Sequence, residues 1–162
     1  MGITIRPMTD EEYRIFYQWS VEHHAKELME QLRKSEEEAL GEAGEEVQGM
    51  LPGGLATANH FLMTIVEESK ETAGFIWTIH EEYEGRKQCF ICDFAIWESM
   101  RRKGYGAAAL ALAEKQAGEA GCRESVLFVS DDNEAAKALY RKCGYRVLRP
   151  EGYGKFMIKD IL

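Results

Sequence analysis

The segment between Cys89 and Val129 constrains the fold more than any other part of the chain, because its predicted elements follow one another in a fixed order. An apolar run over residues 89–97 predicts a buried strand, and an alanine-rich run over 106–120, which ends at Gly121, predicts a helix. A further apolar strand is predicted over residues 125–129. Two strands joined through a helix should lie parallel in one sheet, with a right-handed crossover.

The other predicted elements are short and are joined by polar turns. Strands over residues 61–67, 73–79 and 89–97 follow one another closely, which implies an antiparallel meander. A helix should begin at Thr9, where a capping residue precedes three acidic residues. The remaining predictions are helices over roughly 26–47 and over 134–142, and strands over 3–6, 145–148 and 155–159. The sheet should therefore be mixed, with an antiparallel half and a parallel crossover.

The size and charge of the chain limit the classes of function. Its 162 residues fit one domain, and 45% hydrophobic with 30% charged residues is typical of a globular protein. A net charge of −8 argues against a nucleic-acid binder and is compatible with a cationic substrate. No apolar run approaches the roughly 20 residues of a membrane span, and no signal pattern is present. We therefore expect a cytoplasmic protein that does not bind a membrane.

The four cysteines include one C-x-x-C pair, Cys89 and Cys92, a spacing that occurs in zinc and redox sites. Both residues lie in a predicted strand, where side chains three positions apart point to opposite faces. The two thiols should diverge, and no second ligand pair follows in the sequence. We therefore expect no metal site, and reduced thiols in a cytosolic protein.

The loop between the strand and the helix, Arg101-x-x-Gly104-x-Gly106, has the features of a diphosphate-binding loop. Glycine lets backbone N–H groups approach ligand oxygen atoms, and the helix that follows presents the positive end of its dipole. Three cations, at positions 101–103, stand at its start in an otherwise acidic chain. The sequence has no P-loop and no third glycine at dinucleotide-binding spacing, where Ala109 stands. A turn that merely caps the helix is the structural alternative.

The stretch from Phe94 to Gly106 resembles the central motif of the GCN5-related N-acetyltransferases, the GNAT family, whose loop has the form R/Q-x-x-G-x-G/A after a strand. A second family signature is similar to Asn133-x-x-Ala136-x-x-Leu139-Tyr140-x-x-x-Gly144-Tyr145. The two motifs together cover residues from about 85 to about 150 in the family's order. The sequence departs from the family pattern at Glu98, where proline is frequent, and at Arg102, where glycine is frequent.

The resemblance implies an α/β fold of the α+β type, with a mixed, mostly antiparallel sheet of about six to seven strands and helices on both faces. It implies a single acetyltransferase domain over residues 1–162, with a helical acceptor-side region at 10–55 and an acetyl-CoA-binding core at 89–145. The implied reaction moves an acetyl group from acetyl-CoA (coenzyme A) to a primary amine by direct attack in a ternary complex. The acceptor would be a small-molecule or protein amine, and a homodimer is compatible with the sequence.

The resemblance also implies roles for individual residues. The pantetheine arm of the cofactor would pair with the backbone of Phe94, Ala95 and Ile96, and a strand N–H near Ala95 would stabilise the oxyanion. Asn133 and Ala136 would contact the cofactor arm, and Tyr140 would contact the cofactor and protonate the departing thiolate. The diphosphate would accept hydrogen bonds from backbone N–H groups of the loop, whose members are Arg101, Arg102, Lys103, Gly104, Tyr105, Gly106 and Ala107.

The general base and the catalytic status stay open. Asp93 is a carboxylate in an apolar strand, and strict alternation groups it with Ile91, Ala95 and Trp97. Such a carboxylate either removes the proton of the amine or makes a structural hydrogen bond. Further candidates for the base are His60, Glu81, Glu82 and Tyr83. A non-catalytic acyl-CoA sensor, or an interaction module that uses the acidic stretch 36–46, are the alternatives to an enzyme.

Overall fold

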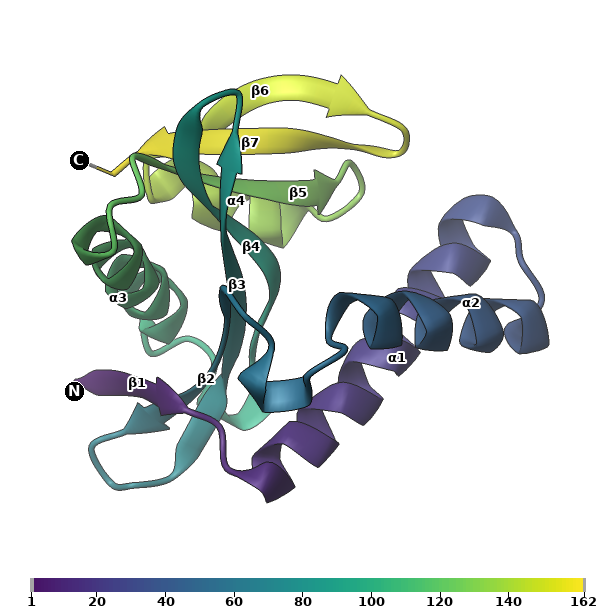
Figure 1. The fold of residues 1–162 in the computed structure, drawn as a ribbon, viewed down its shortest axis with the longest axis horizontal. Coiled ribbons are helices and arrows are strands. Elements are labelled where there is room, and N and C mark those ends of the chain that lie inside the picture. The colour runs from purple at the N-terminus through teal and green to yellow at the C-terminus, as the bar shows by residue number, and fades with distance from the viewer. Residues whose placement is uncertain (1, 162) are drawn as a thin grey trace. The chain divides into compact units, whose positions relative to one another are not determined.

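Seven strands form one sheet in the computed structural model, which describes residues 2–161 (Figure 1). The order across the sheet is β1-β2-β3-β4-β5-β7-β6. The strands are β1 (Ile3–Pro7), β2 (His60–Glu67), β3 (Thr72–Tyr83), β4 (Arg86–Ile96), β5 (Glu124–Ser130), β6 (Arg146–Glu151) and β7 (Gly154–Asp160). β4 and β5 pair in parallel, whereas β1–β2, β3–β4, β5–β7 and β6–β7 are antiparallel. The prediction of a mixed, mostly antiparallel sheet is confirmed.

The chain divides into two compact units. The first contains the residues up to Pro7 and those from Phe61 onward, and it holds the sheet together with helices α3 (Tyr105–Glu119) and α4 (Glu134–Lys142). The second, Met8–His60, holds α1 (Asp10–Leu32) and α2 (Glu36–Met50). The single domain expected over residues 1–162 stays a prediction. Within residues 2–161 no helix is long and apolar enough to cross a bilayer.

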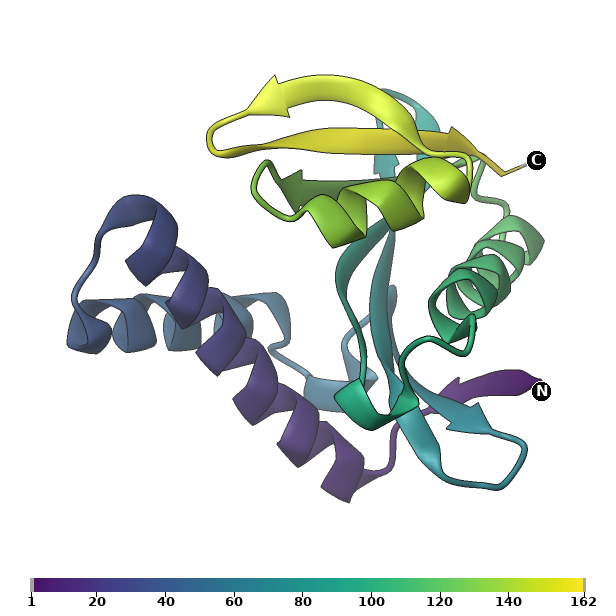
Figure 2. The same ribbon diagram turned by 180° about the vertical axis from the view of Figure 1, so that it is seen from behind.

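The core of the first unit lies between the sheet and α3. One face of α3 consists of small or apolar residues that are fully buried, and their spacing of three to four positions keeps them on one side of the helix. Part of α4 packs against the same cluster, so both helices cover one face of the sheet (Figure 2). The buried α3 residues are Ala109, Leu110, Ala113 and Ala117, and the α4 residues are Ala136, Leu139 and Tyr140.

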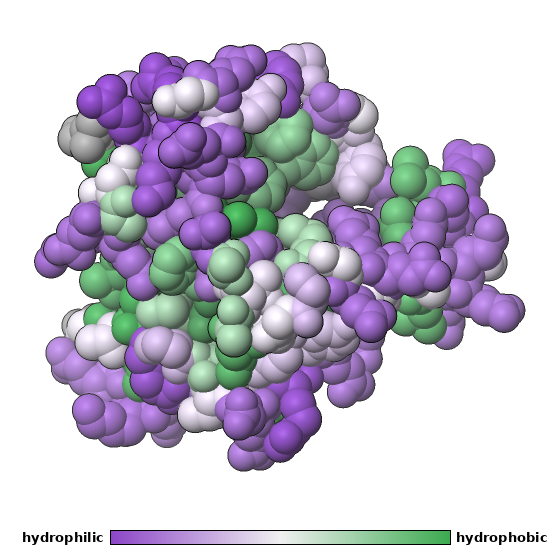
Figure 3. Space-filling model, viewed as in Figure 1, coloured by the Kyte–Doolittle hydropathy of each residue, from purple (hydrophilic) through white to green (hydrophobic). Residues whose placement is uncertain are grey.

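The helices of the second unit begin at matching capping boxes. Thr9 Oγ1 accepts from Glu12 N at the start of α1, as predicted, and Ser35 repeats the arrangement with Glu38 at α2. The helix predicted over 26–47 is wrong at its start, because α1 continues unbroken to Leu32 and the chain turns only at Arg33–Ser35. The face of this unit that Figure 3 shows is mostly hydrophilic with a few apolar residues among the polar ones, and Leu32 and Leu40 are exposed.

β4 contains a bulge at Cys92. Trp77 of β3 pairs with Asp93, but the next residue, Thr78, pairs with Ile91, so Cys92 is the extra residue in the ladder. The prediction that Asp93 shares a face with Ile91 is therefore wrong, because the bulge shifts the alternation by one position. Asp93 instead shares its face with Trp77.

Candidate cofactor and catalytic site

The two parallel strands diverge near the middle of the sheet. The ladder joins Gln88–Ile91 to Glu124–Leu127 and ends there, although β4 continues to Ile96 and β5 continues to Ser130 (Figure 1). The last residues of β4 thus separate from β5 beside the starts of α3 and α4. An extended ligand with amide groups can lie along such a strand edge and hydrogen-bond to its backbone.

The bulge at Cys92 sets the direction of the side chains along this edge. Phe94 and Ile96 are partly buried and pack against the core beneath α3, whereas Asp93 lies on the other face and is 7% exposed. Ala95 is paired with Phe75 of β3. The strand therefore offers its backbone to a ligand while its apolar side chains remain in the core.

The predicted diphosphate loop has a compact turn before α3. A short 3-10 helix, Glu98–Met100, leads into Arg101, and the backbone then takes positive φ angles at Arg102 (65°) and Gly104 (79°). α3 begins at Tyr105, so the N–H groups of its first turn have no acceptor within the helix. A Cβ atom built on Gly104 meets no atom within 4 Å, so the turn is open on this side. The unpaired N–H groups of the first helical turn are the kind of donors that a diphosphate accepts.

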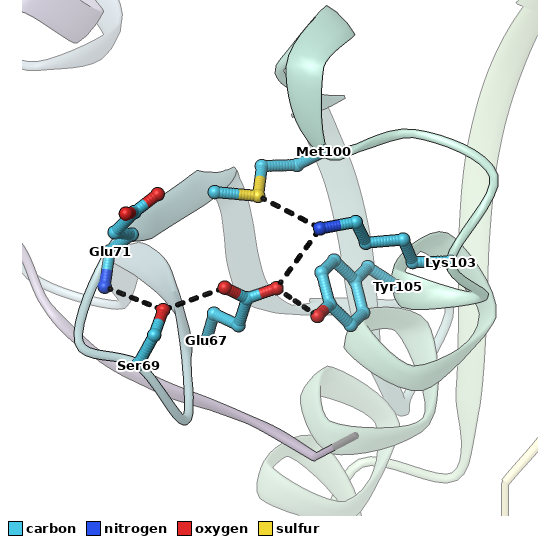
Figure 4. A network of polar contacts seen from close by, with 6 residues as sticks. All are labelled: Glu67, Ser69, Glu71, Met100, Lys103 and Tyr105. Carbon is cyan, nitrogen blue, oxygen red and sulfur yellow. Dashed lines mark hydrogen bonds and ion pairs between the residues drawn. The ribbon is translucent and has the colours of Figure 1, made fainter.

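The side chains of the loop contact two different parts of the sheet. Arg101 Nε donates to Ile96 O at 2.9 Å, which ties the loop to the end of β4. Lys103 Nζ lies 3.4 Å from Glu67 Oε2, and the Tyr105 hydroxyl donates to the same carboxylate (Figure 4). The sequence predicted Lys103 and Tyr105 as cofactor-binding residues. Since both side chains are directed to Glu67, only their backbone groups are available to a diphosphate in this conformation.

The hydrogen bonds to Glu67 shift the ionisation of both partners. The hydroxyl groups of Ser69 and Tyr105, together with Lys103, lower the pKa of the Glu67 carboxyl. The same carboxylate raises the pKa of Tyr105 to about 12, and burial of the phenol contributes to the rise. At neutral pH the network therefore consists of a carboxylate, a neutral phenol and an ammonium group.

Gly106 brings three elements together. A Cβ atom at this position would lie 3.3 Å from Leu139 Cδ2 and 3.9 Å from Phe94 Cζ. The absence of a side chain thus lets α4 and β4 approach the first turn of α3. Ala107, which follows Gly106 and was predicted to contact the cofactor, lies in the same turn and is half-buried.

Tyr140 lies on α4 and faces the interior next to the diverging strands. Its ring contacts that of Tyr145, with centroids 5.9 Å apart. Burial raises the pKa of Tyr140 to about 12, and repulsion between the phenolate form and the ionised forms of Cys143 and Asp93 adds to the rise. The phenol is therefore protonated over the neutral range. The two residues predicted to be catalytic, Asp93 and Tyr140, lie close enough to interact electrostatically.

Asn133 caps α4. Its Oδ1 accepts from Ala136 N at 3.1 Å, and its own N–H donates to Ser130 O at 3.1 Å. Asn133 thus fixes the start of α4 just after β5 ends. Asn133 and Ala136 were both predicted to contact the cofactor arm, and both lie at this end of the helix.

Three of the other candidates for the general base lie at the far end of the β3–β4 hairpin. Glu81, Glu82 and Tyr83 are exposed, and Glu81 pairs with Gln88. Gln88 precedes Asp93 by five residues, which is about 17 Å along a strand. His60 begins β2, and burial lowers its pKa.

Sequence reasoning missed two features of the site. The Cys92 bulge had one signal, since a carboxylate at position 93 fell in phase with the buried Ile91, an arrangement that is costly in an unbroken strand. Glu67 had no signal, because it begins an acidic stretch with Glu68 and Glu71 that is typical of a solvated turn.

Comparisons with known proteins match the chain to acetyltransferases. A model of the acetyltransferase (GNAT) family matches residues 7–145. The chain is 32% identical over 145 residues to the uncharacterized N-acetyltransferase YdgE of Bacillus subtilis, covering 90% of this chain and 92% of that protein. It is 31% identical over 146 residues to YycN of the same organism, covering 90% of this chain and 94% of that protein.

Solved structures show the same fold. The crystal structure of YycN superposes with a TM-score of 0.84 at 30% identity, covering 90% of this chain and 92% of that chain. PaiA N-acetyltransferase from Thermoplasma acidophilum, in complex with coenzyme A, gives a TM-score of 0.73 at 18% identity over 99% of both chains. Spermidine N-acetyltransferase from Vibrio cholerae, with CoA and spermine, gives 0.66 at 18% identity, covering 96% of this chain and 94% of that chain.

The family match spans most of the chain, and both B. subtilis relatives align along nine-tenths of it. The fold expected from the resemblance is the fold that the structure has. The chain therefore belongs to the GNAT family of acetyltransferases, enzymes that use acetyl-CoA as the acetyl donor, as its two motifs predicted.

Proposed function

We propose that the protein transfers an acetyl group from acetyl-CoA to a primary amine by direct attack of the amine in a ternary complex. One observation carries the proposal: β4 separates from β5 after Ile91, at the end of the sheet where the glycine loop opens α3. A strand edge and a helix N-terminus suit the two halves of coenzyme A, an amide-containing arm and a diphosphate.

The cofactor-binding residues follow from this placement. The backbone of Phe94, Ala95 and Ile96 would hold the pantetheine arm, and the backbone from Arg101 to Ala107 would hold the diphosphate. Asn133 and Ala136, at the start of α4, would border the arm. When bound, acetyl-CoA supplies a thioester that is activated toward attack by an amine. A backbone N–H near Ala95 would stabilise the negative charge on its carbonyl oxygen.

Tyr140 is the proposed proton donor to the departing thiolate. Its pKa of about 12 keeps the hydroxyl protonated at neutral pH, so that it can act as a general acid. Asp93 is the proposed acceptor of the amine proton, because it is buried, lies on the strand that would hold the donor and interacts electrostatically with Tyr140.

The proposed acceptor is a small cationic amine or an amine of a protein. A net charge of −8 favours the approach of cations, and the spermidine N-acetyltransferase fold neighbour binds spermine. None of the four cysteines, all of which the structure describes, forms a disulfide bond. This supports a reducing compartment, and we place the protein in the cytoplasm.

A panel of amines assayed for release of free coenzyme A tests the proposal. The wild-type protein should release thiol only when an accepted amine is present, and Tyr140→Phe should release it more slowly at the same amine concentration. Thiol release that is independent of every amine, together with tight binding of acetyl-CoA, would favour the acyl-CoA sensor instead.

A further inference from the structure

Glu67 joins the end of β2 to the start of α3 (Figure 4). Its side chain is 6% exposed, and one carboxylate oxygen accepts from the Tyr105 hydroxyl and from Lys103 Nζ, the latter at 3.4 Å. The other oxygen accepts from Ser69 Oγ at 2.6 Å. Lys103 and Tyr105 lie on either side of Gly104, the N-cap residue that precedes α3. Glu67 thus contacts the residue before Gly104 and the residue after it, which anchors the loop on both sides of this glycine.

The sheet fixes the position of the carboxylate. Glu67 N donates to Glu71 O at 2.9 Å, and Lys70 N donates to Glu67 O at 2.8 Å, which closes the turn after β2. Glu67 is also paired with Ile3 across the β1–β2 ladder. The backbone of Glu67 is therefore held on two sides, and the loop is located by the sheet rather than by its own residues.

We propose that Glu67 and Tyr105 are positioning residues for the acetyl donor: together they hold the Gly104 turn so that its backbone N–H groups converge on the diphosphate. The inference rests on the proposed function. Tyr105 is 2% exposed and directed to Glu67, so neither side chain contacts the donor. Glycine can adopt many backbone conformations, and the two anchors hold Gly104 at the φ of 79° that the turn has here.

If Glu67 acted on coenzyme A only through its charge, its removal would strengthen binding, whereas a positioning role predicts weaker binding. Glu67 neutralises Lys103, so removal of the carboxylate makes the loop more positive and should strengthen binding of anionic coenzyme A. If Glu67 instead positions the loop, removal of its carboxylate should weaken the binding of coenzyme A. Glu67→Gln removes the charge and leaves one acceptor oxygen where the network uses two, so part of the network is lost. Tyr105→Phe removes one hydrogen bond and leaves the charge of Glu67 unchanged.

The same helix carries a matched control network. Glu114 of α3 accepts from the Tyr145 hydroxyl at 2.9 Å and from Lys159 Nζ at 2.8 Å, and its side chain is 11% exposed. Each network therefore consists of one carboxylate, one phenol and one ammonium group. Glu114 lies ten residues beyond Gly104, about 15 Å along the helix, away from the loop.

Calorimetric titration with coenzyme A compares the two networks. Glu67→Gln and Tyr105→Phe should each raise the dissociation constant about tenfold, whereas Glu114→Gln and Tyr145→Phe should change it by less than about twofold. Thermal unfolding of all four variants checks whether the matched pairs lose comparable stability. If Glu67→Gln fails to fold, Tyr105→Phe is compared with Tyr145→Phe instead. Tyr105→Phe keeps the ion pair between Glu67 and Lys103.

A donor without a diphosphate gives the second readout. kcat/KM should fall in Glu67→Gln and Tyr105→Phe with acetyl-CoA but stay unchanged with S-acetylpantetheine, which lacks the group that the loop binds. Binding by the wild-type protein tests the proposed function, and the difference between the matched pairs tests the positioning role. Equal loss of affinity in both networks, tighter binding by Glu67→Gln, or an equal fall with both donors would overturn the positioning role.

Discussion

The protonation state of Tyr140 decides whether it can act as the proposed proton donor. A free phenol loses its proton near the pKa of an amine acceptor, about 10, so the two groups would compete as the pH rises. Burial on the core side of α4 raises the pKa of Tyr140 to about 12, so the phenol would lose its proton at a higher pH than the amine acceptor does. The amine becomes neutral while the phenol still carries its proton.

Tyr140→Phe should lower kcat by about a hundredfold, because general acids contribute 10²–10⁴-fold, and should leave the KM for acetyl-CoA nearly unchanged. Steady-state kinetics with an accepted amine measure both. Tyr145→Phe is the matched control, since its hydroxyl bonds Ser125 and Glu114 instead. Unchanged kcat in Tyr140→Phe would exclude its role as the proton donor.

The pH profile follows from the same raised pKa. Below about pH 10 Tyr140 is protonated in both the folded and the unfolded chain, and between about 10 and 12 only the folded form keeps the proton. kcat of the wild-type protein should therefore rise with deprotonation of the amine and show no alkaline decline below about pH 10. A decline in that range that disappears in Tyr140→Phe would contradict the assignment.

Arg102 shows a local conflict between charge and conformation. Its φ of 65° is in the left-handed region, which costs a residue with a side chain roughly 1–2 kcal/mol. Arg102→Gly should gain up to about 1 kcal/mol of stability, after the added flexibility of glycine in the unfolded chain is subtracted. The loss of one cation should also weaken coenzyme A binding by a few-fold, and less so at high salt.

Urea unfolding and calorimetry measure the two effects separately. Arg33→Gly is the control, because Arg33 has a φ of 55° at the end of α1. This change removes the same charge and should gain similar stability without any change in affinity. Destabilisation by Arg102→Gly would mean that the arginine side chain holds the loop.

At the scale of the element, β4 carries most of the site, and its close spacing to β3 is the feature that mutation can test. A Cβ atom on Gly74 would lie 2.0 Å from Ala95 O and 2.9 Å from Ile96 Cα. Both neighbours are backbone atoms of the strand that would hold the donor, so neither can move cheaply. Gly74 therefore lets the two strands approach at the last residues of β4.

Gly74→Ala should lower the free energy of unfolding by about 2–4 kcal/mol, as severe overpacking does, and should weaken donor binding by displacing β4. Urea unfolding measures the first effect. Gly41→Ala is the control: a Cβ atom there meets nothing within 4 Å inside α2, so alanine should stabilise by about 0.5–1 kcal/mol. Equal stability of Gly74→Ala and the wild-type protein would show that the strands have room to separate.

The helices and strands also show which features the pattern of apolar and polar residues can predict and which it cannot. The strand over 89–97 and the helix over 106–120 were predicted within a few residues, because apolar runs and glycine stops are local signals. The bulge at Cys92 was not, since it depends on the register with β3. The continuation of α1 to Leu32 was missed because the capping box at Ser35, the true start of α2, was overlooked.

At the scale of the whole molecule, the predicted site residues converge from separate parts of the chain. The end of β4, the loop at 101–106 and α4 are brought together by the core beneath α3, as the parallel crossover predicted. Glu67 lies outside this prediction, because its partner Tyr105 is 38 residues away and only the folded sheet brings them together. The division at Met8–His60 likewise depends on long-range packing.

The central claim is that the Gly104 turn binds the diphosphate of the acetyl donor, and a pair of matched variants tests it most directly. Gly104 and Gly85 have φ angles of 79° and 77°, and a Cβ atom at either meets nothing within 4 Å. Glutamate therefore imposes the same backbone strain and the same charge at both positions. Only one of them lies in the proposed site.

Calorimetric titration with acetyl-CoA is the measurement. Gly104→Glu should abolish detectable binding while its thermal unfolding matches that of Gly85→Glu, and Gly85→Glu should bind as the wild-type protein does. Wild-type affinity in Gly104→Glu, or an equal loss in both variants, would contradict the assignment of the loop.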